Sequence, residues 1–270
     1  MLGLYGKKDI KVDQKYFGFS MEIDKIYNED CLVGMKSIPD KSIDCIICDL
    51  PYGTTACKWD VVIPFDKLWE QYRRIIKDNG AIVLFGSEPF SSHLRLSNLS
   101  WYKYDYVWLK TKATGFQNAK IQPMRKHEII SIFYSKQCQF NQQNLIKLDK
   151  PIKSGRERKR NDEQHRLGVA GKTDYYTQFT GWQTSVLSFP NPSGAGHLHP
   201  TQKPVELIRW LIRTYTNEGD LVLDNCMGSG TTAVACIKEK RHFIGYEITK
   251  EYFDIAQERI KQEQSQLTLF

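Results

Sequence analysis

A glycine-containing turn near residue 228 has the residue types and spacing that bind a nucleoside. The segment Asp220 to Glu247 has the pattern of a strand, a glycine turn, a helix and a second strand that ends in an acid. Gly228 and Gly230 permit a sharp turn and a close ligand approach, because neither carries a Cβ atom. The helix N-terminus that follows favours an electron-rich group. The carboxylate of Glu247 can accept both ribose hydroxyls, so we predict a nucleoside-containing cofactor.

The residues of this turn exclude one cofactor class and leave another open. A phosphate-binding Walker loop needs a lysine after its last glycine, and Thr231 stands at that position. The segment from Gly228 to Ala233 matches half of the GxGxxG/A pattern of dinucleotide-binding folds. NAD is therefore an alternative at this point, and an ordinary βαβ unit without a ligand is the other.

A second segment, Asp49-Leu-Pro-Tyr52, joins an acid to an aromatic ring at the end of an apolar run. The run from Ile43 to Cys48 is short and almost continuously apolar, which is typical of a strand buried on both faces. Taken alone, Asp49 fits an ordinary turn or helix-capping acid. In an open parallel sheet, however, loops at the carboxyl ends of the strands converge on one crevice. We therefore expect Asp49 and the glycine turn to meet in space.

The periodicity of the chain predicts an α/β fold with a doubly wound, mostly parallel sheet, because strand and helix patterns alternate. Strands are expected at 21–27, 43–48, 81–85, 104–109, 128–134, 221–224 and 242–247. Helices are expected at 64–77, 89–98, 204–214, 231–240 and from about 250 onward, with Asn79-Gly80 as the stop after the first helix. Residues 136–198 show no sustained period and are too long for an ordinary connection, which indicates an inserted region.

The inserted region contains a strongly basic stretch at 153–166. It holds six Lys or Arg side chains against three acids and has no apolar residue. A solvated surface loop is one interpretation, and an arm that contacts phosphates is the other. On the second interpretation, the phosphate contacts are Lys153, Arg156, Arg158, Lys159, Arg160 and Arg166.

Composition limits the classes of protein and of site. The net charge of +7 suits a polyanionic partner but is weak evidence alone. No apolar stretch approaches the ~20 residues that span a bilayer, and the N-terminus has no secretion signal, so we expect a cytoplasmic protein without membrane contact. Cys45 and Cys48 form a CxxC pair, but no second ligand pair follows at zinc spacing. We therefore predict no metal site.

Three segments resemble motifs of the S-adenosylmethionine-dependent DNA amino-methyltransferases. Asp49-Leu-Pro-Tyr52 is similar to their DPPY motif, and the segment from Asp224 to Thr232 is similar to their cofactor motif, DPFxGSGTT. The segment from His199 to Pro204, HPTQKP, resembles the one that precedes the cofactor motif. With the catalytic motif first and the cofactor motif last, the order resembles that of the β group. The resemblance covers roughly 21–134 and 199–260.

The resemblance implies a Rossmann-like methyltransferase fold and a division of the chain. We expect a lead-in at 1–20, a catalytic half of the methyltransferase domain at 21–135 and a cofactor-binding half at 199–270. The inserted stretch at 136–198 stands where the β group carries its target recognition region.

The resemblance also implies the chemistry of the catalytic motif. The carboxylate of Asp49 and the carbonyl of Leu50 would accept the two hydrogens of the target amine and free its lone pair. Pro51 would fix the turn that aims these acceptors. Tyr52 would stack on a base flipped out of the duplex. Leu50 replaces the first proline of the motif, and we expect this to be tolerated because the residue contributes mainly its carbonyl.

For the cofactor, the resemblance implies S-adenosylmethionine, with Asp30 at the adenine, Lys203 and Pro204 at the methionine part, and Glu247 at the ribose. Asn225 and Cys226 replace Pro and Phe of the motif, which weakens apolar packing against the cofactor. The cofactor-binding residues expected in this way are Asp30, Asp49, Lys203, Pro204, Asp224, Cys226, Gly228, Ser229, Gly230, Thr231, Thr232 and Glu247.

We therefore predict a site-specific DNA methyltransferase that acts on adenine N6 in double-stranded DNA. Cytosine N4 is the alternative, because the same acceptors work on that amine; the family's tendency to place Asp first for adenine and Ser first for cytosine favours adenine. An RNA or protein amino-methyltransferase is less expected, because those often begin the motif with Asn and reverse the motif order. A NAD-linked dehydrogenase would leave 49–52 unexplained. A monomer or a homodimer, with or without a cognate restriction endonuclease, is compatible with the sequence.

Overall fold

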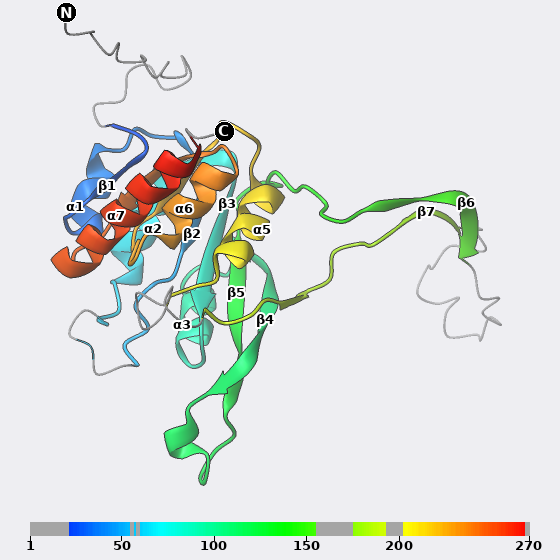
Figure 1. Ribbon diagram of the computed structural model, residues 1–270, viewed down its shortest axis with the longest axis horizontal. Coiled ribbons are helices and arrows are strands. Elements are labelled where there is room, and N and C mark those ends of the chain that lie inside the picture. The colour runs from blue at the N-terminus through cyan, green and yellow to red at the C-terminus, as the bar shows by residue number, and fades with distance from the viewer. Residues whose placement is uncertain (1–21, 55–56, 58–59, 155–174, 193–201, 268–270) are drawn as a thin grey trace, which may run out of the picture. The chain divides into compact units, whose positions relative to one another are not determined.

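The computed structural model describes residues 22–54, 57, 60–154, 175–192 and 202–267 (Figure 1). The chain divides into two compact units. The large unit combines Met1–Asn141 with Ser185–Phe270, and the small unit is Gln142–Thr184.

The large unit is built on an eight-stranded sheet with the order β1-β10-β9-β2-β3-β5-β4-β8. Neighbouring strands are parallel except at β5, which runs antiparallel to both β3 and β4. This arrangement confirms the expected mostly parallel α/β sheet. The strands are β1 (Lys25–Tyr27), β2 (Ile43–Cys48), β3 (Ile76–Gly86), β4 (Tyr102–Thr114), β5 (Arg125–Phe133), β8 (Val186–Ser188), β9 (Leu221–Asp224) and β10 (His242–Tyr246).

Helices cover both faces of this sheet, as a doubly wound fold requires (Figure 1). Side chains of α5 (Val205–Tyr215), α6 (Thr231–Lys238) and α7 (Lys250–Leu267) pack on one face. Side chains of α1 (Cys31–Gly34), α2 (Phe65–Ile75) and α3 (Phe90–Ser97) pack on the other. Two short 3-10 helices, η2 (Met35–Ser37) and η3 (Phe116–Asn118), complete the described helices of the large unit.

The strand β2 shows how the sequence selects these two layers. Cys45 and Ile47 join the core beneath α5, α6 and α7, whereas Ile46 and Cys48 join the core beneath α1, α2 and α3. Alternate side chains of a strand point to opposite faces, so a continuous apolar run supplies both layers. Burying one large apolar side chain stabilises the fold by about 1.5–3 kcal/mol.

The prediction that Asn79-Gly80 ends a helix is wrong, because α2 ends at Ile75 and both residues lie inside β3. A Cβ atom at Gly80 would lie 2.8 Å from the carbonyl oxygen of Asp44 in the neighbouring strand. Glycine is therefore needed here for the close approach of two strands.

The small unit lies within the inserted region. The separate unit spans only Gln142–Thr184, and β8, which follows it, pairs with β4 in the main sheet. Within the small unit, β6 (Ile146–Ser154) and β7 (Tyr175–Thr180) form an antiparallel pair that the sequence did not predict. Across the described residues, none of the helices combines the length and apolar character of a membrane span.

Candidate active site

The catalytic and cofactor segments meet at the centre of the sheet. Strands β2 and β9 are neighbours, with Ile46 opposite Leu223, and both run in the same direction. Asp49 follows β2 and Asp224 ends β9, so both acids lie at the same edge. From this point the order continues to β3 on one side and to β10 on the other, which is the topological switch point where open α/β sheets bind ligands.

A cavity of about 410 Å³ lies at this switch point. It is lined by residues from both segments, which confirms the expectation that they converge in space. The volume is in the ordinary range for a small-molecule site. Lining residues that the sequence had singled out include Asp30, Asp49, Leu50, Pro51, Tyr52, Lys203, Asp224, Cys226, Gly228, Ser229, Thr231, Thr232 and Glu247.

The glycine turn is held by backbone conformation and by Glu247. Gly228 and Gly230 have φ angles of +55° and +83°, which side chains disfavour. The backbone N–H of Gly228 donates to Glu247 Oε2 at 2.8 Å, and the N–H of Thr249 donates to Oε1 at 2.7 Å. Both oxygens are therefore oriented, and burial raises the pKa of the Glu247 carboxyl. Each oxygen keeps a further lone pair, which a ligand hydroxyl can use.

Asp224 closes the other side of the turn. Its carboxylate accepts hydrogen bonds from the backbone N–H of Cys226 at 3.1 Å and from the Thr232 hydroxyl at 2.6 Å. Burial raises the pKa of Asp224 to about 6. The α7 residue Arg259, which no sequence pattern indicated, donates to the carbonyl of Ser229 at 2.5 Å and to its hydroxyl at 3.0 Å. Arg259 therefore ties the last helix to the cofactor turn.

The two residues that depart from the cofactor motif form polar contacts. Asn225 Oδ1 accepts a hydrogen bond from the Tyr72 hydroxyl of α2 at 2.5 Å, and its Nδ2 donates to the sulfurs of Cys31 and Cys226 at 3.6 Å each. The turn is thus joined to α2 and α1 by a buried asparagine. Cys226 is half-buried and lines the cavity.

Asp30 lies between β1 and α1. Strand β1 ends at Tyr27, and Asp30 is the N-cap of α1, where Oδ1 accepts from the backbone N–H groups of Leu32 at 2.7 Å and Val33 at 3.3 Å. An aspartate in this position satisfies helix donors that would otherwise lack partners. The residue still lines the cavity.

Residues Asp49–Tyr52 line another wall of the cavity, and a hydrogen bond joins the two ends of this segment. The Tyr52 hydroxyl donates to Asp49 Oδ1 at 2.5 Å, and one face of its ring stacks on Phe90, with centroids 4.9 Å apart. Asp60, which the motif pattern did not reveal, accepts from the backbone N–H groups of Gly53 at 2.8 Å and Thr54 at 2.9 Å. Asp60 therefore stabilises the turn that follows Tyr52.

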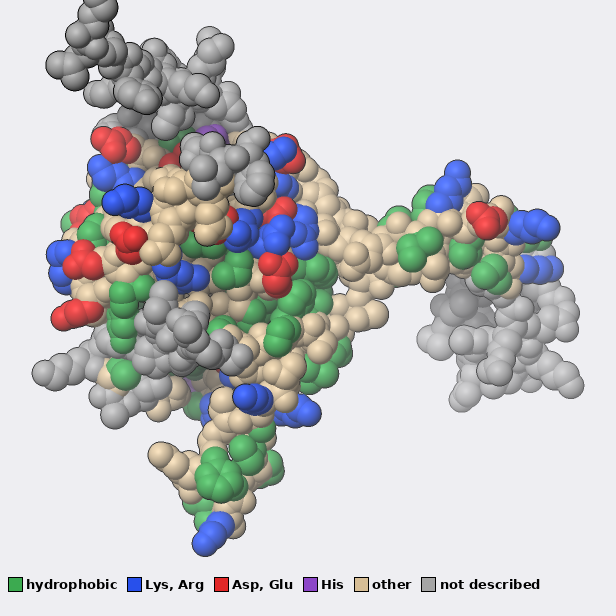
Figure 2. Space-filling model, viewed as in Figure 1, with side chains coloured by type: hydrophobic (Ala, Val, Ile, Leu, Met, Phe, Trp, Pro, Cys, Tyr) green, Lys and Arg blue, Asp and Glu red, His purple; other side chains and the backbone are tan. Residues whose placement is uncertain are grey.

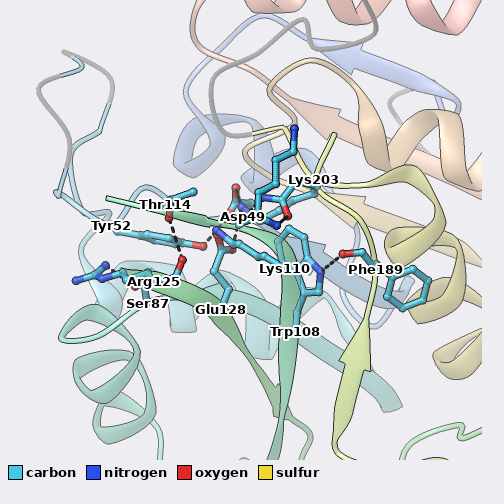
Figure 3. Close-up of polar contacts among 12 residues, drawn as sticks. Asp49, Tyr52, Ser87, Trp108, Lys110, Thr114, Arg125, Glu128, Phe189 and Lys203 are labelled. Carbon is cyan, nitrogen blue, oxygen red and sulfur yellow. Dashed lines mark hydrogen bonds and ion pairs between the residues drawn. The ribbon is translucent and has the colours of Figure 1, made fainter. Parts of the chain in front are cut away.

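A buried chain of ion pairs runs from Asp49 through Lys203 and Glu128 to Lys110 (Figure 3). The ammonium of Lys203 lies 2.5 Å from Asp49 Oδ2 and 3.3 Å from Glu128 Oε2, and Lys110 forms an ion pair with the other oxygen of Glu128. The family resemblance implied a place for Lys203 at the methionine part of the cofactor; in the structure Lys203 lines the cavity and its ammonium contacts the carboxylate of Asp49. Glu128 is linked to Asp49 through their shared partner Lys203. Pro204 is the N-cap of α5.

The pKa values of Asp49, Lys203 and Tyr52 follow from burial and from the neighbouring charges. Burial raises the pKa of Asp49, and the charge of Glu128 adds to this effect while Lys203 opposes it. Burial disfavours the charge of Lys203, but the two carboxylates outweigh it and raise the pKa of the ammonium. Burial also raises the pKa of Tyr52 well above its usual value. At neutral pH, Tyr52 and Lys203 are therefore both hydrogen-bond donors to Asp49.

The predicted DNA-binding residues lie in the small unit or outside the described residues. Lys153 is exposed on β6. Arg156, Arg158, Lys159, Arg160 and Arg166 fall outside the described residues. Among the residues that the structure describes, no cluster of three or more His, Cys, Asp or Glu side chains could hold a metal ion.

Comparison with known proteins agrees with this site. The N6/N4 DNA methylase family profile matches residues 43–258. The type II methyltransferase M.HpaI of Haemophilus parainfluenzae is 29% identical over 247 residues, which cover 87% of this chain and 73% of that protein. The crystal structure of the M1.HpyAVI–SAM complex has a TM-score of 0.58 and 25% identity, covering 87% of this chain and 98% of that one. The cytosine-N4-specific PvuII DNA methyltransferase shares the fold, with a TM-score of 0.62, 15% identity, and coverage of 89% and 90%. This chain belongs to the N6/N4 DNA methylase family and is an S-adenosylmethionine-dependent DNA methyltransferase.

Proposed function

We propose that the protein transfers a methyl group from S-adenosylmethionine to N6 of adenine in double-stranded DNA. The observation that carries this proposal is that Asp49 and Tyr52 share one cavity with the glycine turn and Glu247. A target base and a nucleoside cofactor can therefore approach each other there. The aspartate at position 49 favours adenine, since the family tends to place serine there for cytosine.

The residues of the cavity fit the cofactor. Glu247 has its carboxylate oriented by two backbone amides and offers lone pairs to ribose hydroxyls. Gly228 lines the cavity without a Cβ atom, whereas a Cβ atom at Gly230 would lie 3.0 Å from that of Ala256 in α7. Asp30 and Ser229 line the same space. When bound, S-adenosylmethionine supplies an electrophilic methyl group on a sulfonium.

Asp49 and Leu50 act on the target amine. An ionised carboxylate offers about four acceptor positions, so Asp49 can bind Tyr52 and Lys203 and still accept a hydrogen from the amine. The carbonyl of Leu50 accepts the second hydrogen. These bonds draw the nitrogen towards a pyramidal form whose lone pair attacks the methyl group. The amine releases one proton after the transfer, and the raised pKa of Asp49 favours that proton's uptake by its carboxylate.

Tyr52 holds the base once it has left the duplex. Flipping a base costs a few kcal/mol, and stacking on an aromatic ring recovers about 1–3 kcal/mol. Phe90 covers one face of Tyr52, so the other face is the stacking platform. We further propose that the small unit, with exposed Lys153, contacts the DNA backbone as a target recognition region.

The test is to methylate unmodified plasmid DNA with the purified protein and S-adenosylmethionine, digest it to nucleosides and identify the product by mass spectrometry. We expect N6-methyladenine, and no methylated nucleoside from the Asp49→Ala variant. N4-methylcytosine as the only product would overturn the choice of adenine.

A further inference from the structure

The ends of β4 and β5 form a hairpin whose surface differs from the rest of the large unit. Residues 110–126, here called the 110–126 hairpin, contain five Lys or Arg residues and no Asp or Glu. Three apolar side chains on it are exposed: Phe116 (79%), Ile121 (83%) and Met124 (38%). The visible face of the projecting hairpin accordingly carries apolar and basic side chains but no acidic ones (Figure 2). Exposed apolar groups gathered in one place are typical of an interaction site.

Strand register places this hairpin at the catalytic edge of the sheet. Strand β3 ends at Gly86, which pairs with Ile129, so residues 125–128 of β5 continue beyond the end of β3. Cys48 pairs with Leu84, so β2 delivers Asp49 at that same edge. The hairpin therefore begins beside the catalytic motif and extends away from the sheet (Figures 1 and 3).

The base and the tip of the hairpin are both structured. At the base, the Arg125 guanidinium donates to the Ser87 hydroxyl at 2.6 Å and to the Glu88 carbonyl at 3.2 Å. At the tip, Gly115 has a φ of +88° and leads into η3, and the N–H of Ile121 donates to the carbonyl of Asn118 at 3.0 Å. The apolar side chains of the tip are thus presented on a folded, hydrogen-bonded turn.

The charges of the 110–126 hairpin indicate the chemistry of the partner that it would bind. Lys110 is engaged by Glu128 and Arg125 by the base contacts, whereas Lys112, Lys120 and Lys126 are exposed. Three outward lysines on a segment that contains no acid suit a polyanion. An apolar group carried among cations is the combination that architectural DNA-binding proteins insert between base steps.

We propose that the 110–126 hairpin binds duplex DNA next to the target base and that its apolar tip, Phe116 with Ile121, inserts into the base stack that the flipped base leaves. This inference rests on the proposed function, because it assumes a duplex substrate from which a base is removed. The lysines hold the flanking phosphates, and the tip replaces part of the stacking that flipping removes.

The first experiment compares duplex and single-stranded DNA of the same sequence as methyl acceptors. The Phe116→Ala/Ile121→Ala variant should lose at least tenfold in kcat/KM on the duplex and less than threefold on the single strand, where no stack has to be opened. A matched control is Leu96→Ala/Leu99→Ala, which removes two leucines, 67% and 60% exposed, in the last turn of α3 and just beyond it. The control should retain both activities.

Equal losses of the hairpin variant on the two substrates, or no loss on either, would overturn the proposal. The wild type and the leucine control test the proposed function separately, because both keep the hairpin intact. Calorimetry with S-adenosylmethionine should give the same affinity for all three proteins, which shows that the variants are folded.

A second experiment addresses the charges and the competing explanation that the hairpin is an interface between copies of this chain. The Lys112→Ala/Lys120→Ala/Lys126→Ala variant should reduce the slope of log K against log salt by about 0.9 for each phosphate that is no longer neutralised. The control Lys36→Ala/Lys103→Ala/Lys261→Ala, at exposed positions elsewhere, should leave the slope unchanged. Hairpin variants that change only the sedimentation of the free protein would overturn the proposal in favour of a dimer interface.

Discussion

Lys203 contacts Asp49 across 154 positions of sequence, with 2.5 Å between its ammonium nitrogen and Oδ2 of the carboxylate. The same ammonium is 3.3 Å from Glu128, which also pairs with Lys110. The carboxylate of Asp49 is therefore held on one oxygen by Tyr52 and on the other by the buried chain of ion pairs through Lys203, Glu128 and Lys110.

Asp49→Ala should abolish methyl transfer without weakening cofactor binding. The substitution removes the acceptor of an amine hydrogen, and groups of this kind contribute about 10²–10⁴-fold in rate. Single-turnover methylation measures the loss, and calorimetry with S-adenosylmethionine provides the control. Activity near that of the wild type would show that the carboxylate has no role in activating the amine.

Glu128→Gln should change the pH dependence of the reaction as well as its rate. The charge of Glu128 raises the pKa of Asp49, so its removal should lower that pKa and move the acid limb of the kcat profile to lower pH. The amide keeps the size of the side chain but loses the ion pair with Lys203, which should reduce kcat with little effect on the KM for the cofactor. An acid limb that stays in place would assign Glu128 a structural role alone.

Two substitutions at Tyr52 separate its ring from its hydroxyl. From the sequence, only the ring matters and Tyr52→Phe should be fully tolerated. In the structure the hydroxyl donates to Asp49 Oδ1, and a hydrogen bond to a charged group is worth about 1.5–3 kcal/mol, so Tyr52→Phe should lower kcat roughly tenfold or more. Tyr52→Ala should in addition weaken capture of the base, measured as a rise in the KM for DNA. Equal behaviour of the two variants would argue against stacking.

Glu247→Ala should weaken cofactor binding. Loss of a carboxylate that accepts ligand hydroxyls should cost about 1.5–3 kcal/mol, or roughly 10–100-fold in Kd. Glu251→Ala, at an exposed position in the first turn of α7, is the matched control and should bind normally. Titration calorimetry measures both, and an unchanged Kd for Glu247→Ala would exclude the ribose contact.

The buried Asp224 should make the stability of the free protein depend on pH. Because its folded pKa is raised to about 6, the folded state holds a proton that the unfolded state releases near pH 4, so this group destabilises the fold as pH rises from 4 to 6. The expected loss over the whole range is about 3 kcal/mol, and it should be absent in Asp224→Asn. Urea unfolding in steps between about pH 4 and pH 7 measures it. Parallel pH profiles for the two proteins would contradict the raised pKa.

The sequence by itself determined the local features of this protein. The ends of β2 and β9 agree with the expected strands because a short apolar run buried on both faces has limits that are visible in the chain. The glycine turn and the acid at 247 were likewise recognisable, since backbone freedom and strand ends are local properties. The resemblance of three motifs in order then pointed to DNA methylation.

The tertiary structure decided which distant residues complete the site. Lys203 meets both Asp49 and Glu128, and Arg259 meets the turn at Ser229, only because sheet order and helix packing bring those segments together. Asn79-Gly80 has the residue types of a helix stop, and the approach of the backbone at Asp44 makes it part of a strand instead. Ion pairs and close approaches depend on distances of a few ångströms in space. Residue types and periodicity describe only neighbours along the chain, so they contain no record of those distances.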